Sequence, residues 1–221
     1  MRKHYIKQLI SQGEHQQLDF KFEISDAEKI ARTLVAFANT EGGKLLIGVK
    51  DNGVVKGVSS DEEYFMLENA AQRYCQPEIS FTSKEWLVEG KKVLEVDIPF
   101  SPLRPHRAPD QNGNYRVFVR VKDENFLANG VLMKLWKKQK SKKSIKITYT
   151  EIEEKLLKYL KENSSISIST FKKISRISKY KAESILADFI LLDIINMEIQ
   201  DNGARFVLSD KNNNLPEPNQ I

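Results

Sequence analysis

One short segment of this 221-residue chain carries its whole excess of positive charge, and it separates two parts that are close to neutral. Residues 134–146 hold seven lysines and no acidic residue. Residues 1–133 hold 18 basic and 19 acidic residues, and residues 147–210 hold nine and ten. This distribution predicts two folded domains joined by a basic segment that either stays in water as a linker or neutralises phosphates.

The pattern sets the domain boundaries that we expect. The first domain spans residues 1–140, a basic linker spans residues 141–146, and the second domain spans residues 147–210. The tail, residues 211–221, is polar and contains prolines, which predicts disorder. Two domains also suit the length, because single domains usually span roughly 100 to 200 residues.

The first domain is predicted to mix strands and helices. Leu18 and Phe20 alternate with polar residues, which indicates a strand with one buried face. Ser25 and Glu28 have the spacing of a capping box, so Ser25 is the expected N-cap of a helix. Strands are predicted at residues 17–22, 44–49, 54–58, 78–88, 92–98 and 115–121, helices at residues 26–40, 61–74 and 126–138, and a proline-rich loop at residues 99–114.

The second domain has the element order of a winged helix-turn-helix. Thr150 and Ser178 are suitable N-caps, and Asp201-Asn202-Gly203 is a favoured hairpin turn. Helices are predicted at residues 151–162, 169–174 and 179–191, and strands at residues 195–200 and 205–208. Three helices and a hairpin give the winged-helix order. The expected fold class is therefore α+β, a mixed α/β domain followed by a small winged helix domain.

Several classes of protein are excluded by what the sequence lacks. It has no GxxxxGK[ST] phosphate loop, no histidine and cysteine set with zinc-ligand spacing, and no apolar run near the ~18 residues of a membrane span. Cys75 is the single cysteine, which fits a reducing compartment. No secretory signal is visible, so we expect a cytoplasmic protein that does not bind a membrane.

Three acidic residues are candidates for chemistry in the first domain. Asp19 is out of phase with Leu18 and Phe20, so it points away from the face that those two share. If the strands that contain Asp19 and Asp51 are neighbours, both carboxylates can approach that of Glu14. Clustered carboxylates can hold Mg²⁺ or Mn²⁺ for phosphodiester cleavage. The alternative is that Glu14 and Asp19 are solvated and that the Asp51 side chain stabilises its turn.

These acids belong to a longer set of motifs that covers residues 10–130. The motifs are Glu14-x4-Asp19-Phe20-Lys21, Ala36-Phe37-Ala38-Asn39-Thr40-Glu41-Gly42-Gly43, Ile47-Gly48-Val49-Lys50-Asp51-Asn52-Gly53 with Gly57, Arg104-Pro105-His106, and Tyr115 to Arg120. Together they resemble the Schlafen AlbA-like domain. The resemblance implies a mixed α/β domain described as DNA-binding or ATP-binding. In bacteria it is often joined to a winged helix and assigned to transcriptional regulators.

The resemblance also implies a possible catalytic site. In the animal Schlafen relatives three acids form a metal-dependent RNA endonuclease site, and Glu14, Asp19 and Asp51 match those positions. Position 19 usually carries Glu in the family, and Asp is one methylene shorter. The family is also described as ATP-binding, but this sequence has no motif that would bind a triphosphate. ATP is therefore not an expected ligand.

Basic residues give an independent reason to expect nucleic-acid binding. The third helix of the second domain, expected at residues 179–191, is the one that enters the major groove in helix-turn-helix proteins. Residues 172–181 hold five cations and no acid, and these cations flank the turn before this helix and lie at its start. The lysines of residues 134–146 likewise have no acidic neighbour in the segment. The candidate contact residues are Arg104, Arg107, Lys137, Lys138, Lys140, Lys142, Lys143, Lys172, Lys173, Arg176, Lys179, Lys181 and Arg205.

We therefore expect a nucleic-acid-binding protein whose partner is DNA or RNA, and in particular a DNA-binding transcriptional regulator. One alternative is a metal-dependent ribonuclease that uses Glu14, Asp19 and Asp51. Another is a protein-interaction module, including one that forms a homo-oligomer. The binding functions are favoured over the enzyme.

Overall fold

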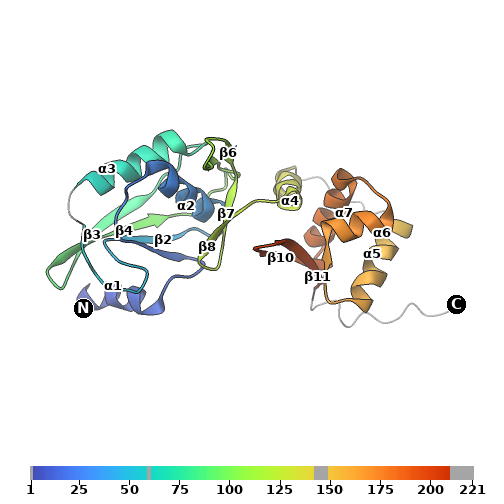
Figure 1. The fold of residues 1–221 in the computed structure, drawn as a ribbon, viewed down its shortest axis with the longest axis horizontal. Helices are drawn as coiled ribbons and strands as arrows, with labels where there is room; N and C mark the ends of the chain where they lie inside the picture. Colours follow the sequence, from blue (N-terminus) through green and yellow to red (C-terminus); the bar gives the residue numbers. More distant parts are fainter. Residues whose placement is uncertain (1, 59–60, 142–148, 210–221) are drawn as a thin grey trace. The chain divides into compact units, whose positions relative to one another are not determined.

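The computed structural model describes residues 2–58, 61–141 and 149–209, and it divides into two compact units (Figure 1). Unit 1 ends at Ala128 and unit 2 begins at Asn129. The sequence-based boundary at residue 140 is therefore too late. Most of the predicted linker and the whole predicted tail lie outside the described residues. Among the residues described, no helix is both long and apolar enough to cross a membrane.

A four-stranded sheet forms the centre of unit 1. Its strands, in spatial order, are β1 (Leu18–Lys21), β2 (Gly43–Ile47), β4 (Lys91–Ile98) and β3 (Thr82–Val88). β1 and β2 are parallel, and the other neighbouring pairs are antiparallel. Side chains alternate between the two faces, so Leu45 and Ile47 pack in one apolar cluster while Leu18, Phe20 and Leu46 pack in another. Both faces of the sheet are buried.

Helices cover both faces of this sheet. α2 (Ala27–Asn39) packs Leu34 and Phe37 into the cluster that contains Leu45. Its N-cap is Asp26 rather than the predicted Ser25, because Asp26 Oδ1 accepts the backbone N–H groups of the next helical turn at 2.8 and 3.1 Å. α1 (Arg2–Gln12) buries Ile6 in the other cluster. The sequence analysis missed α1.

The remaining elements of unit 1 depart from the prediction mainly at residues 54–58 and at Phe126, and a short strand also lies inside the predicted loop of residues 99–114. They are α3 (Glu62–Asn69), the π-helical turn η1 (Ala70–Tyr74), β5 (Ala108–Pro109), β6 (Tyr115–Arg116), β7 (Phe118–Val121) and β8 (Glu124–Leu127). Residues 54–58 form no strand, and a single bridge joins Val49 and Val55. Phe126 lies in β8, which pairs with β7, and not in the helix predicted over residues 126–138. Lys122, at a φ of 56°, lies in the turn between these strands.

Unit 2 has the predicted winged-helix order with one helix added before it. The elements are α4 (Gly130–Lys140), α5 (Glu151–Glu162), β9 (Ile166–Ser167), α6 (Ile168–Ser175), α7 (Lys179–Leu191), β10 (Ile195–Gln200) and β11 (Gly203–Leu208). Thr150 caps α5 and Ser178 caps α7, as predicted. α4 belongs to this unit because its Val131, Leu132 and Trp136 are buried and its lysines bond to α7.

Candidate functional site

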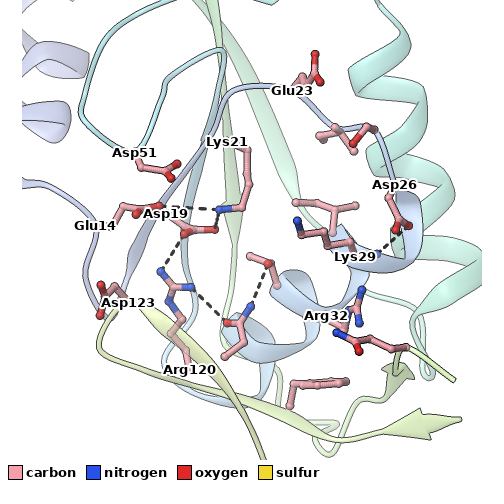
Figure 2. Close-up of a pocket in the computed structure, with 17 residues that line it drawn as sticks. Glu14, Asp19, Lys21, Glu23, Asp26, Lys29, Arg32, Asp51, Arg120 and Asp123 are labelled. Atoms are coloured by element: carbon pink, nitrogen blue, oxygen red, sulfur yellow. Dashed lines mark hydrogen bonds and ion pairs between the residues drawn. The ribbon is translucent and has the colours of Figure 1, made fainter. Parts of the chain in front are cut away.

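The three acids predicted as a site line one pocket of unit 1, with a volume of about 470 Å³ (Figure 2). β1 and β2 run in parallel, with Lys21 opposite Ile47, so Asp19 and the turn that carries Asp51 lie near the same end of the two strands. Glu14 immediately precedes β1. The alternation that sends Leu18 and Phe20 to one face turns Asp19 toward α2. We call this site the carboxylate pocket.

The carboxylate of Asp19 is buried between two cations. Arg120 Nη2 donates to Asp19 Oδ1 at 3.1 Å, and Lys21 Nζ lies 2.9 Å from Oδ2. The side chains of Asp19 and Arg120 are only 4% and 2% exposed. Charges this deeply buried are retained when they are paired. The sequence analysis named Lys21 and Arg120 only within the family motifs and assigned neither to the site, although an arginine inside an apolar strand is itself a sign of a buried acidic partner.

Glu14 is a half-buried member of the pocket. Its Oε1 accepts the backbone N–H of Phe20 at 2.8 Å. Burial, together with a hydrogen bond between its side chain and that of Asp19, raises the pKa of Glu14 from 4.5 to about 7. Near neutral pH the Glu14 carboxyl therefore holds a proton in a large share of the molecules.

Asp51 is exposed, at the edge of the pocket. In its turn, Gly53 N–H donates to the Lys50 carbonyl at 2.7 Å and Val54 N–H donates to Asn52 Oδ1 at 3.2 Å. The side chain that bonds within this turn is therefore that of Asn52. The alternative that assigned this duty to Asp51 finds no support among the described contacts.

The arrangement of these carboxylates does not fit a divalent cation. Mg²⁺ needs near-octahedral oxygen ligands at about 2.1 Å. The Lys21 ammonium stands between the acids, 2.9 Å from Asp19 Oδ2 and 3.9 Å from Glu14 Oε1, and Arg120 takes the other Asp19 oxygen. Within the described ranges, no group of three or more His, Cys, Asp or Glu side chains is placed to hold a metal ion. We derive no metal-dependent step from this geometry.

The pocket as a whole has more acid than base. Six acidic and four basic side chains line it, the basic ones being Lys21, Lys29, Arg32 and Arg120. Lys29 and Arg32 come from α2 (Figure 2). A nucleic-acid phosphate entering this pocket would meet a net negative lining, so the pocket is a poor electrostatic match for a polyanion.

The motif around Asn39 serves the architecture of unit 1. Asn39 is fully buried, donates to the carbonyls of His106 and Phe118 at 2.9 and 2.8 Å, and accepts the His106 N–H at 2.8 Å. Gly42 has a φ of 72°, and a Cβ there would lie 2.7 Å from the Ile98 carbonyl oxygen. At Gly43 a Cβ would overlap the Phe37 ring. The two glycines allow close packing and do not form a phosphate loop.

The proline-rich loop offers one exposed cation. Arg104 is partly buried, lies 4.9 Å from the Phe100 ring centre and donates to the Asn39 carbonyl at 3.4 Å. His106 is buried, with ring nitrogens 2.8 Å from the Pro77 carbonyl and 2.6 Å from Ser101 Oγ. Of the two candidates, Arg104 and Arg107, only the Arg107 side chain is exposed.

Five predicted cations gather around the turn between α6 and α7 in unit 2. They are Lys172, Lys173, Arg176, Lys179 and Lys181, and all except Lys172 are exposed. Within the described part of unit 2, the ion pairs of these side chains consist of one long contact, 3.9 Å between Lys179 Nζ and Glu183 Oε1. We call these residues the cationic turn. Arg205, the predicted contact of the wing, is half-buried and lies opposite Glu198 in the hairpin.

The lysines of residues 134–146 are less free than the sequence suggested. Lys138 Nζ lies 2.6 Å from Asp188 Oδ1 and 3.0 Å from Ser184 Oγ. Lys134 Nζ donates to the Tyr180 carbonyl at 3.1 Å and lies 3.0 Å from the Tyr180 ring centre. Their acidic partners are Glu183 for Lys134 and Asp188 for Lys138. Both belong to α7, about 50 residues further along the chain, so the local sequence could not reveal them. Lys137 and Lys140 are exposed, and Lys142 and Lys143 lie outside the described residues.

Comparison with protein families divides the chain where the structure does. A family model described as "Schlafen, AlbA_2" matches residues 14–129, and one described as "PCI domain" matches residues 131–210. No curated protein matches the chain. The predicted Schlafen AlbA-like domain is confirmed, and the domain that follows it is winged-helix-like.

The solved structures that are similar to the chain include the following two. The DIP2311 protein from Corynebacterium diphtheriae is 19% identical, with a TM-score of 0.43, and the match covers 63% of this chain and 33% of that one. The N-terminal domain of a RecG-related protein from Nitrosomonas europaea is 21% identical, with a TM-score of 0.38, and the match covers 52% of this chain and 86% of that one. The chain therefore spans only about a third of the first of these proteins.

Proposed function

Because this chain belongs to the Schlafen AlbA_2 family, we propose that it is a nucleic-acid-binding protein. The family resemblance implies DNA binding, and the winged-helix-like unit 2 supplies a surface of the right charge. The single observation that carries the proposal is the cationic turn, where four exposed long cations have almost no acidic partner. Exposed cations of this kind bind phosphates and release counterions, which gives affinity for any nucleic acid.

The surface suits a phosphate backbone better than the carboxylate pocket does. Lys173, Arg176 and Lys181 are exposed and have no described ion pair. Arg and Lys side chains, together with backbone N–H groups, make most contacts to phosphates in protein–DNA complexes. The pocket of unit 1 offers a buried Asp19–Arg120 pair and a lining with more acidic than basic side chains. We therefore place nucleic-acid binding on unit 2.

A role as a transcriptional regulator is a narrower form of this proposal. It requires that the chain prefer one DNA sequence, which charge alone does not provide. The ribonuclease alternative rests on the approach of Glu14, Asp19 and Asp51 in one pocket, and it requires that a metal displace the Lys21 ammonium. An interaction module is the remaining alternative, and it predicts a protein partner in place of nucleic acid.

The test compares two variants that lose the same charge. The first changes Lys173, Lys179 and Lys181 of the cationic turn to Gln. The control changes three exposed lysines of α5, Lys155, Lys158 and Lys161, to Gln. Affinity for labelled DNA and RNA is measured by fluorescence anisotropy at several salt concentrations.

We expect the cationic-turn variant to lose roughly 100-fold in affinity, at ~1 kcal/mol per charged contact, and the control to stay within a fewfold of the wild type. Equal losses in the two variants would show that only net charge matters. Absence of binding by the wild type to every DNA and RNA tested would reject the proposal. Retained binding to a protein partner would then favour the interaction module.

A further inference from the structure

We infer that unit 2 holds nucleic acid by its phosphate backbone at the cationic turn and does not read base sequence with α7. This inference rests on the proposed function and specifies the ligand as the sugar–phosphate backbone of any sequence. It concerns the helix that occupies the place of a recognition helix in the winged-helix order. In helix-turn-helix proteins, three or four exposed side chains of that helix reach base edges in the major groove.

The first support is that α4 packs against the side of α7 that does not face the core of the winged helix. Lys134 Nζ donates to the Tyr180 carbonyl, and Lys138 Nζ contacts Ser184 and Asp188. These three α7 residues are four apart, so they form one face of the helix. Gly130, which begins α4, comes so close to Glu183 that a Cβ would meet its carboxylate. α4 therefore lies along two turns of α7.

The second support is burial along α7. Ala182, Ile185 and Phe189 face the core of the winged helix, while Glu183 is buried beside α4. As a result, no residue from Ala182 to Leu191 is exposed. The exposed part of α7 is its first turn, Lys179, Tyr180 and Lys181. One turn of helix does not reach across several base pairs.

The third support is side-chain chemistry. Base edges are read by Arg to guanine and by Asn or Gln to adenine, in bidentate geometry. α7 contains no Arg, Asn or Gln. Ser178 is used as the N-cap of α7, with its Oγ accepting the Lys181 N–H at 3.3 Å, and Ser175 is buried. The exposed groups that remain are mainly lysines, which bind phosphate as point charges.

The fourth support is the backbone conformation at Arg176. It ends α6 in the left-handed region, with φ 51° and ψ 44°, where helices usually place glycine. A non-glycine residue there carries conformational strain. The strained position presents an exposed guanidinium at the tip of the turn. Strain of this kind is a reason to suspect a functional side chain.

The same feature supplies a variant that separates binding from folding. Arg176→Gly removes the cation and also relieves the left-handed strain, so we expect an unchanged or higher melting temperature. Affinity is expected to fall for every nucleic acid to the same degree. The slope of log affinity against log salt should decrease by about 1, as for the loss of one phosphate contact. The control is Lys161→Gln, which removes one exposed cation of α5. Gln is used in place of Gly because glycine inside a helix would destabilise it.

Sequence preference is measured with the full chain and a random-sequence duplex library carried through rounds of selection. We expect no enriched motif, and affinities within about twofold for unrelated duplexes of one length, as backbone contacts imply. An enriched motif bound at least tenfold more tightly would overturn the inference and leave the proposed function standing. Equal affinity for all sequences with no effect of Arg176→Gly would also overturn it, because the backbone contact would then lie elsewhere. No binding to the library at all would reject the proposed function itself.

Discussion

The carboxylate pocket of unit 1 and the cationic turn of unit 2 both concentrate charge, but they use it in opposite ways. In the pocket, Asp19 and Arg120 are almost fully buried and neutralise each other. On the turn, Arg176 and Lys181 are exposed, and within the described chain they have no ion pair. Charges that are already paired hold a fold together, whereas exposed unpaired charges are available to a partner. Asp19 and Arg120 of the first unit therefore hold each other in place, and the binding surface that we propose lies in the second unit.

The largest effect that would sharpen this comparison is expected at Arg120. Arg120→Met leaves Asp19 buried without its main partner, and removing one member of a buried pair costs about 3–5 kcal/mol. Each unit contains one tryptophan, Trp86 in unit 1 and Trp136 in unit 2. In a Trp136→Phe background, fluorescence during urea unfolding therefore reports the free energy of unfolding of unit 1.

The control for Arg120 is an exposed ion pair in the same unit. Lys92 pairs with Glu85 at 3.3 Å, and both side chains are 60% exposed. Lys92→Met should change the free energy of unfolding by less than about 1 kcal/mol. If Arg120→Met were equally mild, the pocket would not be a structural charge cluster, and the comparison would fail.

The next effect concerns the pH dependence of unit 1. The pKa of Glu14 is raised to about 7 in the folded chain from 4.5, so the folded state holds a proton that the unfolded state has lost between these values. The stability that the protonated Glu14 carboxyl adds is fully present below pH 4.5 and is lost as pH rises through 7. The melting temperature of the wild type should therefore fall relative to that of Glu14→Gln between pH 5 and 8.

Glu89 provides the opposite case. Its hydrogen bond with Lys7 lowers the pKa of Glu89. The contribution of this carboxylate to stability is therefore fully present at any pH above the ordinary pKa of a glutamate. The difference between the wild type and Glu89→Gln should stay flat between pH 5 and 8. A flat difference for Glu14→Gln as well would mean that its carboxyl is solvated, as the alternative in the sequence analysis held.

A smaller effect tests the docking of α4 in unit 2. Lys138 and Asp188 are in contact at 2.6 Å and are 31% and 25% exposed. Lys138→Met should lower the free energy of unfolding of unit 2 by about 1 kcal/mol, measured through Trp136 in a Trp86→Phe background. Lys137→Met, one residue away and exposed, should have no measurable effect. Equal effects would show that α4 is not fixed on α7 by this contact.

The smallest expected effect is the response to metal. Mn²⁺ should leave the melting temperature of the wild type unchanged, because the Lys21 ammonium already lies between the carboxylates. Lys21→Met removes that cation, so a Mn²⁺-dependent rise is expected in this variant alone. Cleavage of labelled RNA by the wild type with Mn²⁺, abolished by Glu14→Gln and by Asp51→Asn, would instead establish the ribonuclease.

The local part of this structure could be predicted from the sequence, and the long-range part could not. The alternation around Leu18 and Phe20 correctly predicted that Asp19 lies on the opposite face of the strand. This prediction needs only local sequence, because successive side chains of a strand point to opposite faces. The partner of Asp19 is Arg120, 101 residues away, and only the folded sheet brings the two together. That Asp51 lies in the same pocket as Asp19 likewise depends on β1 and β2 being neighbours, which the sequence does not show.

The errors in element assignment have similar causes. Phe126 fits the apolar spacing of a helix as well as that of a strand, and its pairing with Val119 decides for the strand. The helix that follows was predicted, but its docking on α7 depends on Lys138 meeting Asp188, a tertiary contact. The exposure of Lys179 and Lys181 could be expected, because both lie outside the apolar stripe of α7, while their contact with nucleic acid stays a prediction.

The most direct test of the central claim is to find where nucleic acid touches the chain. Ultraviolet crosslinking of the full chain to labelled DNA or RNA, followed by peptide mapping, reports contacts without any mutation. The account predicts crosslinks at Tyr180, which is 77% exposed and lies between Lys179 and Lys181 in the cationic turn. Crosslinks confined to the lining of the carboxylate pocket, such as Phe118, with none at Tyr180, would contradict it.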